Sequence, residues 1–596
     1  MRVFYAHIFR VNSFIIREEC CDVEPVRFRA RRKSGGWLKW IVVLSGLLAM
    51  LSVIWVGWER LSPNNKEVKP DYGTVHPIIY HGEAVKVGAL VDGDNLRLPL
   101  SFIHDQLGLG TEVYFEDKTG TIVMTNANKV LRFKTNALTA TMNKAAYPLR
   151  IAAEVKDDVV YLPTTPLEEL YGLHIEYNKN TDIVTVMSAG DAVQRGISSE
   201  EGVIRTSPSI HATIVKRLVQ KEELRIWGEK DGWYVVQSMD GVAGYASKKE
   251  ITITELEQVK AQQEPAPYNA WKVIGSKINL TWEAIYQKAP DTSKIGDLTG
   301  VNVVSPTWFE LLDAEGNIKS KADKQYVAWA HKQGMQVWAV FSNSFEPDRT
   351  TAALGSANTR LQMIRQLSAY AELYQLQGIN LDFENVNTSD KANLVQFVRE
   401  LTPLMHEQGV VVSIDVSPKS NSEMWSLFLD RAALGKAVDY MMVMAYDEHW
   451  ASSPISGSVA SLPWTEQSVK TILEEDGVPA NKLVLGMPLY ARLWTEKKDD
   501  SGKTKVTSKA LSMDTVNGII AERKLTPTFD ADSGQHYVEY KEDGALQRIW
   551  IEDGLSMKSR TALAKKYGLA GVATWQRQFS SDDIWGIINQ SLKQLP

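Results

Sequence analysis

One apolar run dominates the hydropathy pattern near the start of the chain. Residues 40–58 form 19 consecutive positions without a charged side chain, and a helix of that length spans about 28 Å, enough for a bilayer core. Tryptophans flank the run, where indole rings prefer the lipid–water interface, and a basic cluster precedes it. These residues are Trp37, Trp40, Trp55 and Trp58, and Arg27, Arg29, Arg31, Arg32, Lys33 and Lys39. The pattern predicts a cytoplasmic basic tail over 1–36 and a transmembrane signal-anchor over 37–58.

Everything after this run is then expected outside the cell, as the ectodomain of a single-pass protein of the cell membrane that faces the cell wall. A cleaved signal peptide and a buried core helix are the alternatives. The run is long for a signal peptide, and the following VGWERLSPNN lacks a small-x-small cleavage pattern. Cys20 and Cys21 both precede the run, so packed cores rather than disulfides must stabilise the outer part.

A repeated pattern follows a polar linker over 59–74. Between 75 and 190, short β-like runs are broken by Gly, Asn and Asp, and 96–124 matches 160–186. Each copy reads as a strand, a short helix and a hairpin, which predicts a small α+β domain. The region resembles the copper amine oxidase N-terminal-like domain. Its two histidines, His104 and His174, are isolated, so we expect packing or surface roles and no metal site.

Residues 198–254 alternate apolar and polar positions between Gly-containing turns, which predicts a small β-barrel. The order R-x-x-P, G-W-x-x-V and G-x-x-G-Y resembles a bacterial Src-homology-3-like domain and implies binding of cell-wall peptide or glycan. Alternatively, Trp233 and Tyr245 only pack the core. A second linker is expected over 255–269, which is charged and carries two prolines.

Eight apolar runs alternate with amphipathic helical stretches over 270–596. They span 277–283, 301–308, 336–343, 378–385, 411–418, 439–447, 482–490 and 571–576. This count predicts an α/β protein whose catalytic domain is a (β/α)8 barrel. Polar and aromatic residues gather where the runs end, and in such a barrel those ends form the active-site face. They are Trp308, Asn343, Glu384, Tyr446, Asp447, Tyr490 and Trp575.

Asp382 and Glu384 carry the most specific chemical signal. Residues two apart on a strand share a face, with Cα atoms roughly 6.5–7 Å apart. Two carboxylates this close disfavour double ionisation, so one pKa rises, as a general acid on a glycosidic oxygen requires. The alternatives are a paired surface carboxylate and a Ca²⁺ site, but no ligand-rich loop accompanies the pair.

The 270–596 region resembles glycoside hydrolase family 18, whose pattern D-x-x-D-x-D-x-E reads here as residues 377–384, QGINLDFE. The last Asp and the Glu match, whereas Gln377 and Asn380 replace the first two Asp residues. Met444-Ala445-Tyr446-Asp447 matches the motif of the sixth strand, Gly486–Arg492 that of the seventh, and Trp575 the tryptophan of the last strand. The segment GINLDFENV is most similar to the spore and cell-wall branch of this family.

The resemblance implies retaining, substrate-assisted hydrolysis without metal or cofactor. Glu384 would protonate the leaving oxygen, Asp382 would stabilise the oxazolinium formed by the sugar's own acetamido group, and Tyr446 would hold the acetamido oxygen. Trp575 would lie beneath the −1 sugar. Further substrate contacts are implied for Asp447, Tyr490, Arg492, Asn380, Met444 and Asn343, with Trp308 and Trp494 as additional candidates. Arg492 is alternatively a structural ion-pair partner.

A net charge of −6, from 66 basic and 72 acidic residues, gives no reason to expect a nucleic-acid partner. The sequence therefore predicts a membrane-anchored hydrolase of N-acetylglucosamine bonds in peptidoglycan. A chitinase and a non-catalytic lectin that binds chitin or peptidoglycan remain as alternatives. Because Asn380 removes one charge from the usual pattern, we expect Asp382 to ionise more readily. Alternatively, Asn380 only satisfies buried backbone groups.

Overall fold

The computed structural model describes residues 36–199, 202–260, 277–498 and 502–593. The basic cluster over 27–33, both cysteines and most of the expected second linker lie outside these residues. The chain divides into two compact units, and the first comprises Met1–Lys66 with Ser209–Thr213. It contains helix α1 (Gly36–Leu61), in which Lys39–Leu61 is long and apolar enough to cross a membrane and buries none of its side chains. A signal sequence would have the same properties.

The predicted repeat is present in the strand-rich domain that follows. Each copy consists of a strand, a short helix and a hairpin. The first has β4 (Asn95–Pro99), α2 (Leu100–Asp105), β5 (Val113–Glu116) and β6 (Thr121–Thr125), and the second has β11 (Val159–Pro163), α3 (Thr164–Tyr171), β12 (His174–Asn178) and β13 (Ile183–Met187). Strands β4 and β11 pair antiparallel with Leu98 opposite Leu162, so equivalent strands join the two copies. The other strands are β1 (Ile78–Tyr80), β2 (Glu83–Ala84), β3 (Leu90–Asp92), β7 (Val130–Lys134), β8 (Thr139–Met142), β9 (Ala145–Pro148) and β10 (Glu154–Lys156).

A seven-stranded antiparallel sheet follows, in the order β16-β15-β19-β18-β17-β14-β20. Its strands are β14 (Ala192–Ser198), β15 (Val203–Arg205), β16 (Ile214–Arg217), β17 (Glu223–Lys230), β18 (Trp233–Ser238), β19 (Ala243–Ser247) and β20 (Ile251–Gln258). The sheet is longer than the expected unit over 198–254. Residues 255–258, expected to begin a linker, instead end strand β20, because they pair with β14. Trp233 and Tyr245 are both partly exposed.

The C-terminal region closes into the predicted barrel of eight parallel strands. Their order is β22-β21-β35-β29-β28-β27-β26-β25, and β22 pairs with β25 to complete the ring. The strands are β21 (Ile278–Glu283), β22 (Val303–Pro306), β25 (Gln336–Ser342), β26 (Gly378–Asp382), β27 (Val411–Val416), β28 (Tyr440–Met444), β29 (Leu483–Pro488) and β35 (Gly571–Trp575). Every predicted strand of the barrel is therefore confirmed, with ends that differ by at most three residues.

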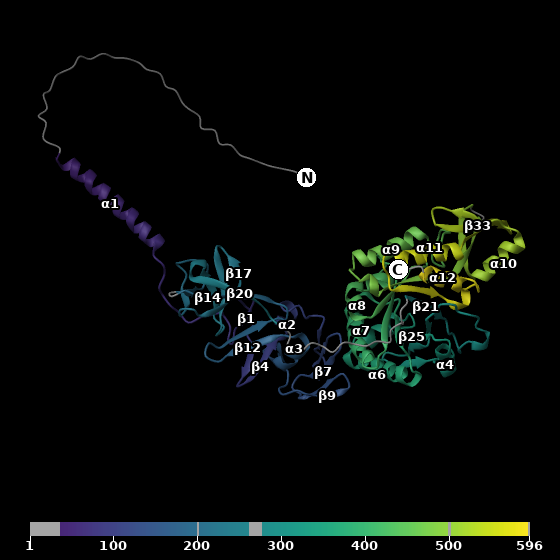
Figure 1. Ribbon diagram of the computed structural model, residues 1–596, viewed down its shortest axis with the longest axis horizontal. Coiled ribbons are helices and arrows are strands. Elements are labelled where there is room, and N and C mark those ends of the chain that lie inside the picture. The colour runs from purple at the N-terminus through teal and green to yellow at the C-terminus, as the bar shows by residue number, and fades with distance from the viewer. Residues whose placement is uncertain (1–35, 200–201, 261–276, 499–501, 594–596) are drawn as a thin grey trace, which may run out of the picture. The chain divides into compact units, whose positions relative to one another are not determined.

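Helices cover the outside of the ring (Figure 1). They are α4 (Lys324–Lys332), α5 (Pro347–Leu354), α6 (Ala357–Tyr374), α7 (Lys391–His406), α8 (Arg431–Ala437), α9 (Leu462–Glu474), α11 (Gly554–Lys566) and α12 (Ile584–Lys593). Two short strands, β23 (Phe309–Leu311) and β24 (Ile318–Ser320), extend the sheet. An insertion after β29 holds β30 (Tyr490–Lys498), β31 (Thr504–Ser512), α10 (Met513–Arg523), β32 (Thr528–Asp530), β33 (Gln535–Glu542) and β34 (Ala545–Ile551).

Several barrel strands are apolar on both faces because both faces are buried. On β25, for example, Trp338 and Val340 belong to one core cluster, whereas Val337, Ala339 and Phe341 belong to another. Alternate residues of a strand point to opposite faces, and the other faces of these strands pack against the helices in a second cluster. Such strands appear in the sequence as continuous rather than alternating apolar runs.

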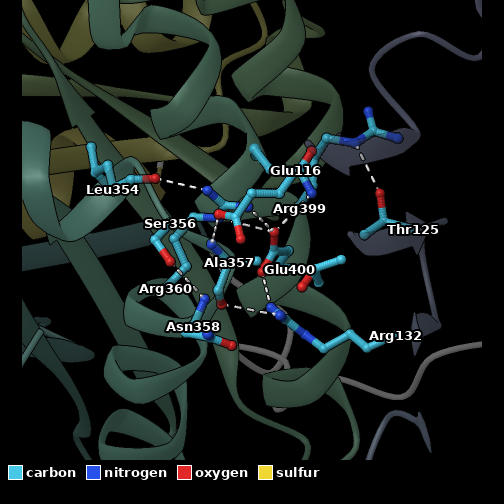
Figure 2. A network of polar contacts seen from close by, with 12 residues as sticks. Glu116, Thr125, Arg132, Leu354, Ser356, Ala357, Asn358, Arg360, Arg399 and Glu400 are labelled. Carbon is cyan, nitrogen blue, oxygen red and sulfur yellow. Dashed lines mark hydrogen bonds and ion pairs between the residues drawn. The ribbon is translucent and has the colours of Figure 1, made fainter. Parts of the chain in front are cut away.

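The repeat domain packs against helices α6 and α7 through a polar network (Figure 2). The Arg132 side chain on β7 donates to Glu400 of α7 and, at 3.1 Å, to the Ala357 carbonyl. Arg360 donates through Nε to Glu400 Oε1 at 3.0 Å, and Glu116 accepts from the Ala357 N–H at 2.9 Å. The same interface joins Arg399 to Glu112 and Thr125, and Asn143 to Glu407. Arg360 and Glu400 are fully buried, so the interface encloses a buried ion pair of the barrel to which Arg132 adds a second cation.

Candidate active site

The carboxyl end of strand β26 carries the two predicted acidic residues. Asp382 is the last residue of the strand, and Glu384 follows two positions later. The strand can approach β25 closely because it starts at Gly378, where a Cβ would lie 2.4 Å from the Trp338 ring. Both carboxyl groups are partly buried. Sequence and packing thus place a pair of carboxyls at the face of the barrel where strands of this fold end.

Asn343, which follows strand β25, fixes the backbone of Glu384. Its Oδ1 accepts the Glu384 N–H at 3.0 Å, and its Nδ2 donates to the Glu384 carbonyl at 2.7 Å. The Asn343 side chain also donates to Thr350 Oγ1 at 3.0 Å and is 1% exposed. Its amide groups are therefore occupied by the protein. The expected direct contact with substrate gives way to a positioning role.

Burial and like charge keep protons on the pair. Burial raises the pKa of Asp382 to about 6. The pKa of Glu384 is raised well above its usual range, first by burial and then by the charges of Asp382 and Asp447. Burial therefore favours the protonated form of both carboxyls, and the neighbouring negative charges favour it further at Glu384. A carboxyl that favours its proton, next to a second carboxyl, is the arrangement that proton donation to a leaving group with charge stabilisation uses.

Asp415 on strand β27 is a third carboxyl that sequence reasoning missed. It is 3% exposed, and its Oδ2 accepts a hydrogen bond from Asn380 Nδ2 at 2.6 Å. Ser413 Oγ donates to Asn380 Oδ1 at 2.9 Å. Asn380 does remove a charge from β26, but Asp415 supplies one on the neighbouring strand. Burial raises the pKa of Asp382 to about 6, and the expectation that Asn380 lets Asp382 ionise more readily than an Asp at that position would stays a prediction.

The carboxyl end of strand β28 supplies the next group. The pKa of the Tyr446 phenol is raised well above its usual range, first by burial and then by the charges of Asp415, Asp382 and Glu384. Asp447 accepts from the Tyr490 hydroxyl at 2.6 Å and from Arg492 Nη2 at 2.8 Å. Tyr490 and Arg492 are 5% and 8% exposed. Both hydrogen-bond to Asp447, which fits the ion-pair alternative for Arg492.

The remaining candidates divide by burial. Trp575, which ends strand β35, is partly exposed and packs 6.0 Å from the Trp282 ring centroid. Met444 ends β28 and is also partly exposed. Trp308 and Trp494 are 0% exposed, and Trp494 Nε1 donates to the Gly457 carbonyl at 2.8 Å. The expectation that these two tryptophans contact sugar is wrong, because the core encloses them.

Large exposed rings surround this face on loops that follow four strands. Phe345 and Trp425 lie with ring centroids 6.3 Å apart. The exposed fractions of Tyr286, Phe345, Trp425 and Trp450 are 78%, 49%, 46% and 53%. Flat apolar rings at a barrel mouth can stack on sugar faces. Among the residues that the structure describes, no group of three or more His, Cys, Asp or Glu side chains could hold a metal ion.

The model of the glycosyl hydrolases family 18 matches residues 279–580, which contain this barrel and every residue of the site above. The chain belongs to family 18 of the glycosyl hydrolases. It is therefore a glycoside hydrolase. The model of the copper amine oxidase N-terminal domain matches residues 79–186, which contain the repeat.

Curated relatives share this family 18 region. The uncharacterized glycosylase YvbX of Bacillus subtilis strain 168 is 28% identical over 321 residues, which is 51% of this chain and 89% of that protein. The cortical fragment-lytic enzyme of Bacillus anthracis is 24% identical and covers 46% of this chain, and this chain spans 64% of its length. Di-N-acetylchitobiase of Rattus norvegicus is 25% identical over 46% of this chain and 81% of its own length.

Solved structures also resemble the barrel. The spore cortex-lytic enzyme SleL of Bacillus megaterium QM B1551 has a TM-score of 0.48 at 18% identity, over 57% of this chain and 78% of that one. The chitinase from Chromobacterium violaceum ATCC 12472 has a TM-score of 0.47 at 23% identity, over 54% of this chain and all of that one.

Proposed function

We propose that this family 18 hydrolase cleaves N-acetylglucosamine glycosidic bonds of cell-wall peptidoglycan, with retention and with the substrate's own acetamido group as nucleophile. The observation that carries the proposal is the pair at the end of β26. Glu384 follows Asp382 by two positions at the carboxyl end of the strand, and burial raises the pKa of both carboxyls. An enzyme that uses a neighbouring acetamido oxygen needs an acid and a charge stabiliser but no nucleophile of its own.

Each remaining group has a role in this reaction. Glu384 protonates the glycosidic oxygen as the bond to the leaving sugar breaks. The acetamido carbonyl attacks C1, and anionic Asp382 stabilises the resulting oxazolinium. The Tyr446 phenol, which remains protonated, donates to the acetamido oxygen. Trp575 lies beneath the −1 sugar, Met444 borders it, and Asp447, with Tyr490 and Arg492 behind it, contacts the sugar from the side of β28.

Three observations favour peptidoglycan over soluble chitin fragments. Exposed rings on several loops suit a long glycan rather than a single sugar. Relatives include enzymes named for the spore cortex. An apolar helix precedes the strand-rich domains and would hold the enzyme next to the wall. Di-N-acetylchitobiase among the relatives keeps a chitin-type substrate as the second candidate.

Product analysis tests both the reaction and the substrate. The detergent-solubilised full chain is incubated with peptidoglycan sacculi or with chitin oligosaccharides, and products are identified by mass spectrometry. We expect new N-acetylglucosamine reducing ends from sacculi, with the β-anomer first in early NMR spectra. Glu384→Gln should lower kcat by about 10²–10⁴-fold with the fold and glycan binding intact. Binding by wild type without any product would establish a lectin instead.

A further inference from the structure

The buried carboxyl of Asp415 has no part in the steps above, although it lies among the catalytic groups. It is on β27, two residues after Ser413, and Ser413 pairs with Asn380 of β26. The last registered pair of these parallel strands is Leu381 with Ile414. Asp382 and Asp415 are therefore the next residues along two hydrogen-bonded strands.

The two carboxyls each have one oxygen without a partner. Asp415 Oδ2 is satisfied by the Asn380 amide, but Asp415 Oδ1 and Asp382 Oδ1 are both buried and have no hydrogen-bond partner among the described residues. Buried polar atoms in native proteins are almost always paired. Oxygens of two carboxyls at adjacent positions on paired strands can satisfy each other only when one proton lies between them, because two anions would repel.

We propose that Asp415 is a positioning residue that shares one proton with Asp382 and keeps it when the glycan binds. The inference rests on the proposed function. In the free enzyme the proton lies between the two Oδ1 atoms. When the acetamido N–H of the substrate meets Asp382, the proton stays on Asp415, and Asp382 is left as the anion that the oxazolinium needs. No net proton enters or leaves the site.

The surroundings of Asp415 are consistent with this protonated state. Burial and the charges of Asp382 and Glu384 raise its pKa well above the usual range, while the Asn380 hydrogen bond opposes the rise. The indole N–H of Trp282 lies near enough to favour the charged form, although it makes no hydrogen bond of its own within the described residues. The Tyr446 phenol also faces the group. No Lys, Arg or His is among the causes of the shift.

The pH dependence of the free energy of unfolding tests, without any substrate, whether Asp415 carries a proton. A carboxyl whose pKa is raised in the folded chain binds more protons than the same group unfolded, whose pKa is about 3.9. The free energy of unfolding therefore falls as pH rises above that value. Asp415→Asn removes this fall, so thermal unfolding of the full chain should give a higher Tm than wild type at pH 8, with the gap closing towards pH 4.

An exposed control, Asp231→Asn, should differ from wild type by a constant offset. A Tm of Asp415→Asn that lies below wild type by the same amount at every pH would overturn the proposal, because it would assign Asp415 a purely structural role. This arm does not depend on the glycan, so it stands even if the proposed substrate is wrong.

Kinetics test the coupling to Asp382. Asp415→Ala removes the donor, so Asp382 must ionise alone in a buried site. We expect kcat to fall by about 10–100-fold and the acidic limb of kcat/KM to move to higher pH. Asp415→Asn places an amide donor at the same position and should keep the acidic limb of wild type. Identical acidic limbs in wild type and Asp415→Ala would refute the shared proton.

Discussion

Asn343 brackets Glu384: its amide oxygen accepts the Glu384 N–H at 3.0 Å and its amide nitrogen donates to the Glu384 carbonyl at 2.7 Å. Both hydrogen bonds join the residue that follows β25 to the loop that follows β26. The acid is thus held by its backbone rather than by its carboxyl, and the side chain stays available for the leaving oxygen.

Loss of the two hydrogen bonds from Asn343 should slow the chemical step more than it weakens substrate binding. Asn343→Ala leaves two backbone groups of Glu384 without partners, and displacement of a catalytic group by about 1 Å can cost about 10²-fold. We expect kcat to fall by about 10–100-fold with KM nearly unchanged, as measured with a chromogenic N-acetylglucosamine oligomer. A raised KM with unchanged kcat would return Asn343 to the sugar-binding role expected from the sequence.

Two substitutions around Asp447 should move the alkaline limb of kcat/KM in opposite directions. The charge of Asp447 raises the pKa of Glu384, so Asp447→Asn should lower that pKa and move the alkaline limb to lower pH. Arg492→Met removes the cation that faces Asp447 at 2.8 Å and should move the limb upward. The acidic limb, which reports Asp382, should stay near pH 6 in both variants. Shifts of the same sign would contradict this electrostatic account.

The buried charges of Arg132, Arg360 and Glu400, where the repeat domain packs against helices α6 and α7, should contribute strongly to the free energy of unfolding. Glu400→Gln would leave Arg360 and Arg132 buried without their shared anion, at a cost of about 3–5 kcal/mol in the free energy of unfolding. Arg132→Met should cost less, because Arg360 and Glu400 still pair at 2.9 Å. Equilibrium urea denaturation measures both.

The control for this series is an exposed pair of the same domain. Lys179 contacts Asp94 at 2.5 Å with side chains 67% and 87% exposed. Exposed pairs contribute at most about 1 kcal/mol, so Lys179→Met should remain near wild type. An equal loss in Lys179→Met and Glu400→Gln would show that burial of the network is unimportant.

The apolar helix should place the N-terminus inside the cell and the barrel outside. Protease added to intact cells is expected to release fragments of the ectodomain while a tag on the basic tail stays protected, and lysed cells provide the control. N-terminal sequencing of the mature protein decides the alternative. A mature end between residues 56 and 75 would identify a cleaved signal peptide.

The barrel could be predicted because its strands are local in sequence. Each is a short apolar run that ends in polar or aromatic residues, and the eight runs recur along the chain. Asp382 and Glu384 were found for the same reason, since both are at the end of one run. Trp308 also ends one of the predicted runs, yet it is buried, because the sequence does not show which way a ring turns at the end of a strand.

Asp415 and the Arg132–Glu400 contact could not be predicted, for a different physical reason. Asp415 lies inside the apolar run VVVSIDVS, and its hydrogen-bond partner Asn380 is 35 positions away in the sequence. Arg132 and Glu400 are 268 positions apart. The sequence around Asp415 or Arg132 does not show the partner of either residue. The pairing of strands β26 and β27 creates the first contact, and the packing of the repeat domain on the barrel creates the second.

The interface between the repeat domain and helices α6 and α7 also affects what proteolysis can do. Strands β20 and β21 are joined by one stretch of backbone, residues 259–277, and a single cut there would produce two fragments. Arg132, Glu116 and Glu112 of the repeat domain would still bind the barrel from across the cut. A nicked protein would therefore run as one species on a native gel and separate only in denaturant, so cleavage at this point would not release the barrel from the N-terminal domains.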